Sequence, residues 1–308
     1  MLWEVEVQRG GSSEFVFGAG AASLMLAISA GGLLLSPITA HAQSTARPGI
    51  LLAESNSAGD RQPGKGMDPA LEAKLDEAAA AYKKLATADI DSLVANSDKM
   101  LAAMQAGDAA GARQAWIDAR TGYERSEIFT IKFPSLDSAI DSWPNSETGF
   151  HGIEAKLFAP GAPLPLAETQ TLVDKVHTLQ RVFNGEPLYG HGVLVGIGSL
   201  AFELGESKAK GGESAISGTS LLDMQHNVDG IELAWKTVFA KIVRDKNAGV
   251  ADRVEKEIAE VRQLVSVASL DRVDAQALEQ KAEMLAGSVS DAAVELGWPA
   301  PDFTDTDD

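Results

Sequence analysis

The sequence predicts an all-α fold, arranged as two four-helix bundles packed in tandem. Ala and Leu are frequent among the 308 residues, with 12 Pro, 3 Tyr and no Cys, and this composition favours helices over strands. No segment alternates apolar and polar residues with period two. Apolar residues instead recur at helical spacing over about eight segments, which suits two bundles. A hydrophobic fraction of 45% is enough to bury a core of that size.

The first helix has clear boundary signals. Asp68 is a typical N-cap, and Pro69 fits the first helical position. The pattern predicts a helix to about residue 105, after which Asp108 caps a second helix that reaches residue 129 or 131. The predicted buried stripe of the first helix consists of Leu71, Leu75, Ala78, Tyr82 and Leu85.

Further helices follow from the same periodicity. A loop over 132–147 holds one helical turn at 136–141, and a helix containing His151 ends at 159–161. The remaining predicted helices cover 166–183, 189–208, 220–246, 250–267 and 271–297, with a polar loop at 211–219. The helical domain is thus expected over 67–300, with the two bundles divided near residue 184 and an acidic tail at 301–308.

The first 42 residues are predicted to be a signal peptide. An almost uncharged run, 15–35, precedes small residues that place Ala at positions −3 and −1 of a cut after Ala42. The residues before the run are acidic rather than basic, so we expect translation to start downstream of Met1. A membrane anchor is the alternative, because the run is just long enough to span a bilayer. Cleavage would leave a flexible linker at 43–66 and a periplasmic protein without disulfides.

The charge balance restricts the partners. The chain has 44 acidic against 26 Lys and Arg residues, a formal net charge of −18. Nucleic-acid binding needs clusters of Lys and Arg, so we expect no nucleic-acid partner. The same negative field favours a cationic ligand.

The second predicted helix carries charged residues where a buried face is expected. Its stripe, with spacings of four, three and four, consists of Trp116, Arg120, Tyr123 and Glu127. Arg120 and Glu127 do not belong on such a stripe unless they are paired or bind a ligand. Glu124 lies on the adjoining face. The alternative is an exposed Arg120–Glu124 pair, with Glu127 at a frayed helix end.

His151 and Glu154 are three residues apart, so they share one helix face. An imidazole beside a carboxylate is a common half of a metal site. The alternative is a hydrogen bond between these two side chains or to the backbone.

Several acidic residues lie close to this pair in sequence. Glu124, Glu127, Asp141, His151 and Glu154 fall within one short stretch of two neighbouring helices and their connection, and Asp137 is a spare. These residues can converge on one ion. A donor set made mostly of carboxylate oxygen suits iron, manganese, calcium or a mixed zinc site rather than copper(I).

Several spaced motifs are similar to the EfeO/imelysin-like family. They are Trp116–Arg120, Tyr123–Glu127, Phe133 with Leu136–Asp141, Gly149–Glu154, and later Glu203–Lys208, Gly212–Ser214 and Leu222–Gly230. The resemblance covers about 69–298 and implies a pair of four-helix bundles. It also implies a metal site of the His-x-x-Glu type at Glu124, Glu127, Asp141, His151 and Glu154, and a periplasmic role in iron uptake. An inner-membrane iron permease and a periplasmic peroxidase are the partners expected of such a system.

Two departures from the family pattern are visible. Only the linker precedes the helices where full-length iron-uptake members have a cupredoxin-like domain, so the chain resembles the short form called EfeM. Gly152 stands where many relatives have a basic residue after the motif histidine.

The residues leave two other functions open. In a metallopeptidase, His151 would bind zinc and Glu124 would act as general base, although the usual pair of histidines four apart is missing. A protein that binds an acidic polysaccharide such as alginate would need metal ions to bridge the two negative surfaces.

Overall fold

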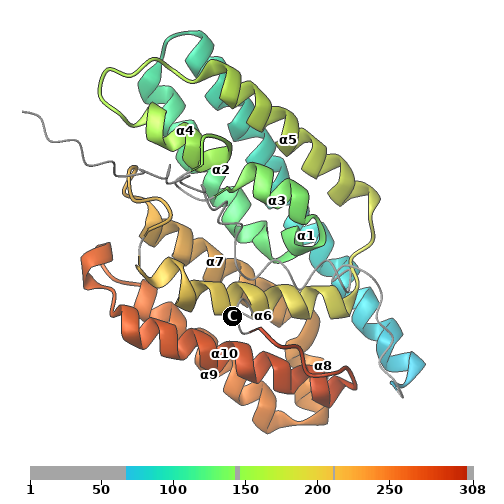
Figure 1. The fold of residues 1–308 in the computed structure, drawn as a ribbon. Helices are drawn as coiled ribbons and strands as arrows, with labels where there is room; N and C mark the ends of the chain where they lie inside the picture. The colour runs from blue at the N-terminus through green and yellow to red at the C-terminus, as the bar shows by residue number, and fades with distance from the viewer. Residues whose placement is uncertain (1–66, 143–145, 211, 304–308) are drawn as a thin grey trace, which may run out of the picture. The chain divides into compact units, whose positions relative to one another are not determined.

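A computed structural model describes residues 67–142, 146–210 and 212–303, and all regular elements in these ranges are helical (Figure 1). The α-helices are α1 (Pro69–Gln105), α2 (Ala109–Ser126), α3 (Pro134–Ile140), α4 (Gly149–Leu157), α5 (Leu166–Gly185), α6 (Gly190–Glu206), α7 (Ser220–Ala234), α8 (Ala240–Lys246), α9 (Ala248–Val265) and α10 (Ala275–Leu296). Short turns of other helix types are η2 (Glu127–Lys132), η3 (Lys208–Lys210), η4 (Trp235–Phe239) and η5 (Leu270–Arg272). The predicted signal peptide, its cleavage site and the linker lie outside the described residues.

The predicted starts of the first two helices are confirmed. The Asp68 side chain accepts a hydrogen bond from the amide of Ala70 at 2.9 Å, and Pro69 is the first residue of α1. Asp108 accepts one from the amide of Gly111, also at 2.9 Å. Each cap satisfies an amide that the helix itself leaves without a partner.

The predicted buried stripe of α1 is only partly right. Leu75 and Tyr82 are fully buried, but Leu85 is 49% exposed. Ala79 and Ala86 face the core instead, because small side chains let the neighbouring helices approach α1 closely. The periodicity predicted the helix correctly, but it placed Leu85 on the buried stripe although this side chain faces water.

The helices of the first half pack around α1. Helices α2 and α5 both pack against α1, and α4 packs against α2 and α5 (Figure 1). In the second half, α6 and α9 both pack against α10, while α7 contacts α6 and α9. All described residues belong to one compact unit. The division into two four-helix bundles near residue 184 stays a prediction.

The predicted helix over 220–246 is not uniform. The π-helical turn η4 separates α7 from α8, and Trp235 at its start is fully buried. A π turn inserts one extra residue into the helical pattern and shifts the buried face, which is why one continuous stripe did not describe this segment.

Helix α7 crosses α2 at a glycine. A Cβ atom placed on Gly230 would lie 2.5 Å from the carbonyl oxygen of Arg125, a backbone atom of α2. Because glycine has no Cβ, the two backbones approach closely enough to bring polar residues on α2 and α7 within hydrogen-bond distance.

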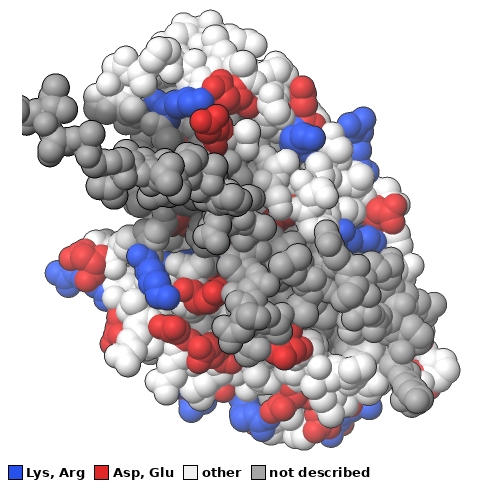
Figure 2. All heavy atoms as spheres, viewed as in Figure 1, with Lys and Arg blue, Asp and Glu red and all other residues white. Residues whose placement is uncertain are grey.

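The surface is mixed in charge. Figure 2 shows acidic side chains over both the upper and lower parts of the visible face, with Lys and Arg side chains among them. None of the helices in the described ranges combines the length and the apolar content that crossing a bilayer requires.

We predict that Gly230→Ala destabilises the protein by about 1–3 kcal/mol, because the added methyl group must push α2 and α7 apart. The control is Gly287→Ala on the exposed face of α10, where an added Cβ meets no atom within 4 Å. That change should stabilise the protein by about 0.5–1 kcal/mol through helix propensity. Urea unfolding measures both. Equal effects of the two substitutions would contradict the close α2–α7 contact.

Candidate metal centre

Aromatic side chains fix α4 against α2. The indole Nε1 of Trp116 donates a hydrogen bond to the carbonyl oxygen of Phe150 at 3.0 Å, and the two rings meet edge to face. Tyr123 also packs on Phe150, with ring centroids 6.0 Å apart. Since His151 follows Phe150 directly, these contacts place the imidazole next to the polar residues of α2.

Glycine allows the chain to turn sharply into α4. Gly149 has φ of 69°, a conformation that residues with a side chain rarely adopt. A Cβ atom there would also lie 2.6 Å from Ser142 Oγ. This tight return after α3 brings Asp141 back to α4, with Asp141 Oδ1 3.2 Å from His151 Nε2.

Gly152 has a steric role. A Cβ atom at this position would lie 2.4 Å from the carbonyl carbon of Glu147. The basic residue expected here in many relatives would therefore require the backbone at Glu147 to move. Glycine at this position, where many relatives are expected to have a basic residue, therefore allows the backbone at Glu147 to lie close to α4.

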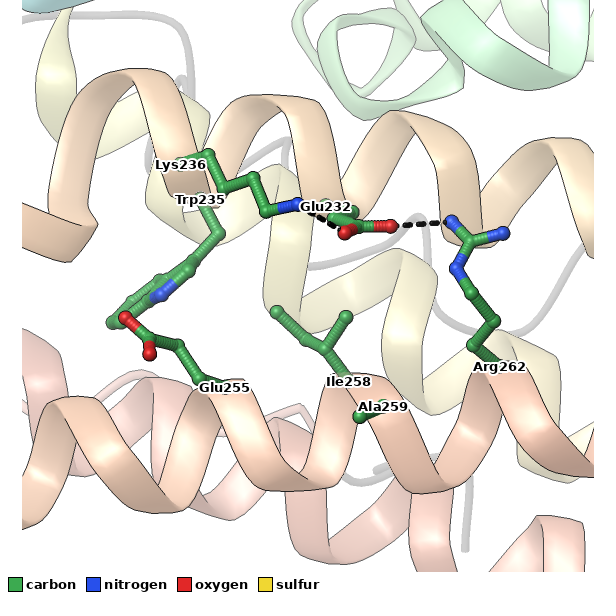
Figure 3. A pocket seen from close by; sticks show the side chains of 7 residues that line it. All are labelled: Glu232, Trp235, Lys236, Glu255, Ile258, Ala259 and Arg262. Atoms are coloured by element: carbon green, nitrogen blue, oxygen red, sulfur yellow. Dashed lines mark hydrogen bonds and ion pairs between the residues drawn. The ribbon is translucent and has the colours of Figure 1, made fainter.

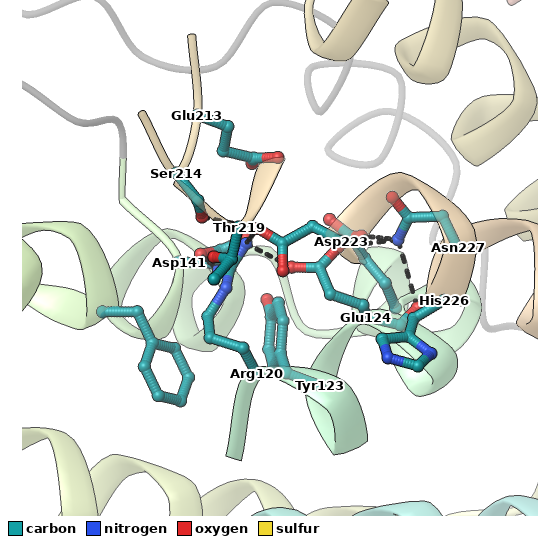
Figure 4. Close-up of polar contacts among 12 residues, drawn as sticks. Arg120, Tyr123, Glu124, Asp141, Glu213, Ser214, Thr219, Asp223, His226 and Asn227 are labelled. Atoms are coloured by element: carbon teal, nitrogen blue, oxygen red, sulfur yellow. Dashed lines mark hydrogen bonds and ion pairs between the residues drawn. The ribbon is translucent and has the colours of Figure 1, made fainter. Parts of the chain in front are cut away.

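Arg120 is at the centre of a buried ionic network (Figure 4). Its side chain is 1% exposed and forms ion pairs with Glu124, Asp141 and, at 3.2 Å, Asp223 of α7. The alternative of an exposed Arg120–Glu124 pair is therefore wrong: the two residues do pair, but both are buried. A charged residue on the buried stripe is tolerated because three carboxylates surround it.

Lys208 is the second buried cation. Its Nζ lies 3.1 Å from Glu124 Oε2, 2.9 Å from Glu127 Oε2 and 3.2 Å from Glu213 Oε2. Asn227 of α7 adds a neutral donor, because its Nδ2 bonds Glu124 at 2.7 Å (Figure 4). The same nitrogen bonds Glu127 at 2.8 Å. Glu124 and Glu127 therefore have partners from the second half of the chain.

The two ring nitrogens of His151 have different surroundings. Its Nδ1 lies 3.1 Å from Glu154 Oε2, and the other Glu154 oxygen accepts the amide of Ser217 at 2.6 Å. The Nε2 atom is buried and lies 3.2 Å from Asp141 Oδ1 as an ion pair, but it forms no well-aligned hydrogen bond among the described residues. Asp141 and Glu213 are its neighbours, and one ligand atom of each of the three residues lies within 4.8 Å of the others.

The structure thus brings two predicted ligands, Asp141 and His151, together with Glu213. It places the other three in adjoining contacts: Glu124 and Glu127 with Lys208, and Glu154 with His151. The spare residue, Asp137, accepts a hydrogen bond from the Tyr123 hydroxyl.

Sequence reasoning missed the members of the network that come from the second half of the chain: Lys208, Glu213, Asp223 and Asn227. Glu213 lies on an irregular loop and has no periodic signal. The only available signal was the resemblance of Gly212–Ser214 and Leu222–Gly230 to the family, which did not identify them as site residues.

The network contains more acids than bases. Besides the permanently charged Arg120 and Lys208, it holds six buried carboxylates, namely Glu124, Glu127, Asp141, Glu154, Glu213 and Asp223. Burial raises the pKa of Glu124 well above its usual value despite Arg120 and Lys208, and burial likewise raises the pKa of Asp223. Without a further cation, the surplus negative charge is therefore reduced by bound protons.

The histidine is also perturbed. Burial and the charge of Arg120 act to lower the pKa of His151, but its close contacts with the carboxylates of Asp141 and Glu154 outweigh them and raise it to about 9. The metal-free site thus holds a proton on the imidazole at neutral pH. A metal ion would take the place of that proton.

A separate pocket between α7, η4 and α9 has different chemistry (Figure 3). Its cavity volume is about 280 Å³, and its charged groups largely neutralise one another: Glu232 pairs with Lys236 and with Arg262. Trp235 lines it but is fully buried, so its indole is not accessible to a ligand. Among the described residues, the metal-ligating side chains converge at His151 and not here.

The sequence model of the imelysin family matches residues 78–295, which is more than half of the chain. The iron uptake system component EfeM of Pseudomonas syringae is 29% identical over 204 residues, which cover 60% of this chain and 68% of that protein. EfeO of Yersinia pseudotuberculosis, named as an iron uptake system component, is 31% identical over 196 residues. That match covers 57% of this chain and 52% of EfeO, so the chain spans about half of that relative. An EfeM/EfeO family lipoprotein of Staphylococcus aureus is 24% identical over 243 residues, 75% of this chain and 85% of the lipoprotein.

We predict that the metal-free protein loses stability between pH 6.5 and pH 9. The folded-state pKa of His151 is raised from 6.5 to about 9, so its contribution is complete below pH 6.5 and is lost as pH rises towards 9. The raised pKa values of Glu124 and Asp223 act in the same direction. The His151 shift alone corresponds to roughly 3 kcal/mol.

Urea unfolding in the presence of a chelator, repeated at intervals across this pH range, measures the loss. His151→Gln should flatten the pH dependence, whereas His177→Gln, at a half-exposed pair with Asp98, should keep it. A wild-type protein that is equally stable at both ends of the range would contradict the buried, protonated histidine.

Proposed function

We propose, on the premise that the chain belongs to the imelysin family, that this protein is an exported metal-binding component of an iron-uptake system. The observation that carries the proposal is the buried Nε2 of His151, which forms no well-aligned hydrogen bond within the described part of the chain and faces Asp141 Oδ1 at 3.2 Å and Glu213 Oε1 at 4.0 Å. It lies in a network with more carboxylates than cations. Burying this surplus of negative charge costs free energy while the site is empty, and a bound cation would compensate it.

The donor set fits the proposed cargo. Asp141, His151 and Glu213 offer one imidazole nitrogen and carboxylate oxygens, a mixture that suits iron and is also compatible with manganese, zinc or calcium. Glu154 accepts a hydrogen bond from Nδ1–H and thereby leaves the lone pair of Nε2 available. The remaining ligands of the predicted set have other partners in this structure: Glu124 and Glu127 contact Lys208, and Glu154 contacts His151.

The proposed cellular role draws on the relatives. Two of them are named as components of iron uptake systems, and one as a lipoprotein, which supports an exported protein. We place this chain in the periplasm after cleavage following Ala42. There it would collect iron and deliver it to an inner-membrane permease, with a periplasmic peroxidase as a further partner.

The metallopeptidase alternative has less support from the geometry. A general base must reach a metal-bound water, but Glu124 is held by Arg120 and by Lys208 and is fully buried. Both oxygens of that carboxylate are engaged, Oε1 by Arg120 and Oε2 by Lys208 and Asn227. Binding of an acidic polysaccharide, bridged by metal ions, stays a prediction without an observation in its favour.

We predict that His151→Ala weakens binding of Fe²⁺ more than about 100-fold, because it removes a direct ligand. Glu154→Gln should have a smaller effect, about 10- to 100-fold, because Glu154 orients the imidazole. Anaerobic isothermal titration calorimetry measures both. The matched control is His177→Ala, which removes a half-exposed histidine outside the site and should leave the affinity unchanged. Unchanged affinity in His151→Ala would refute the proposed site.

We also predict that metal binding releases protons and weakens as pH falls. The pKa of His151 is about 9 in the metal-free protein, so the ion displaces a proton at any pH below that value. For one displaced proton, the affinity should fall about tenfold for each pH unit. Calorimetry in two buffers with different ionisation enthalpies counts the released protons. An affinity that does not change between pH 6 and pH 8 would contradict a protonated ligand.

A further inference from the structure

Lys208 is an unusual lysine because it is buried and has three anionic neighbours. Its side chain is 2% exposed, and its Nζ lies within 3.2 Å of Glu124, Glu127 and Glu213. An ammonium group has three N–H donors, so each carboxylate can take one. Burying a lysine costs several kcal/mol unless opposite charges compensate. These three carboxylates therefore form a cation site, and the chain's own ammonium group fills it.

Glu213 connects this cation site to the proposed metal site. Its Oε2 contacts Lys208 at 3.2 Å, while its Oε1 lies 4.0 Å from His151 Nε2. In two-metal sites, the two ions are about 3.5–4 Å apart and can share ligands of this kind. Lys208 and the proposed metal ion would therefore share Glu213, as two ions of such a pair share a bridging carboxylate.

We propose that the Lys208 ammonium permanently occupies a second cation site, and thereby limits the protein to one bound metal ion. The first ion rests on the proposed function above, but the second site rests only on the contacts of Lys208. Without the ammonium group, Glu124, Glu127 and Glu213 would offer hard oxygen donors to a divalent cation. Asn227 can add another, because its Oδ1 is buried without a hydrogen-bond partner among the residues that the structure describes, and a rotation of the amide would exchange it with Nδ2.

The test replaces Lys208 and counts bound ions. Lys208→Met removes the charge and keeps an unbranched side chain, and Lys210→Met is the matched control on the exposed side of the same turn. Equilibrium dialysis against Mn²⁺, followed by elemental analysis, gives the number of ions per chain. We expect one Mn²⁺ for the wild type and for Lys210→Met, and two for Lys208→Met. Electron paramagnetic resonance should then show an exchange-coupled Mn²⁺ pair in Lys208→Met alone. An unchanged count without that signal would overturn the proposal.

A double variant separates this inference from the proposed function. In Lys208→Met combined with His151→Ala, we expect the count to fall from two ions to one. If the wild type binds no Mn²⁺ and Lys208→Met binds one, the proposed function fails and the second site stands. If the double variant and Lys208→Met both bind none, the second site is refuted.

Loss of the buried charge can also prevent folding in the absence of metal, and a chemical rescue addresses that case. Lys208→Ala leaves room for propylammonium, which restores the missing part of the lysine side chain. We expect propylammonium to raise the thermal unfolding temperature of Lys208→Ala above the value in an equal concentration of tetramethylammonium, which has no N–H group to donate and is too bulky for the space. Equal unfolding temperatures in the two salts would overturn the assignment of a cation site.

Discussion

The surplus of buried carboxylates over Arg120 and Lys208 is the constraint on which the centre of this protein depends. Hydrophobic burial can fix where helices lie, but it cannot compensate acids that the packing removes from water. Each buried acid here therefore has its own source of compensation: an ion pair, a hydrogen bond, a retained proton or, in the proposed function, a metal ion. The two basic side chains contact the acids from different directions, with Arg120 on α2 and Lys208 after α6.

The packing around the network serves this electrostatic arrangement. Trp116 and Phe150 lock α4 onto α2, and the missing side chain at Gly230 lets α7 approach α2. Both contacts are made by residues without charge. They nevertheless determine which charges meet, because a shift of 1 or 2 Å between helices separates an ion pair into two buried, uncompensated groups. The apolar and ionic parts of the core are in this sense one structure.

The sequence predicted the helices better than the site. Helix caps at Asp68 and Asp108 and the stripe of α2 depend on local spacing, and local spacing can be read from one sequence. The charged stripe residue Arg120 even indicated that buried partners must exist. The identity of those partners depends on how the second half of the chain packs, and Glu213 and Asp223 lie far from Arg120 in sequence. The π turn at Trp235 was also unpredictable by periodicity, since it interrupts the very pattern that periodicity measures.

The position of Glu213 has a mechanical consequence. Asp141 and His151 belong to the first half of the chain and Glu213 to a loop of the second half, so an ion held by all three would join segments that are distant in sequence. A chain with no cysteine forms no disulfide, and the ion would cross-link these segments reversibly instead. Loaded and empty molecules would then differ in rigidity as well as in charge. A docking partner could distinguish the two forms by how readily the halves separate, without any direct contact with the ion.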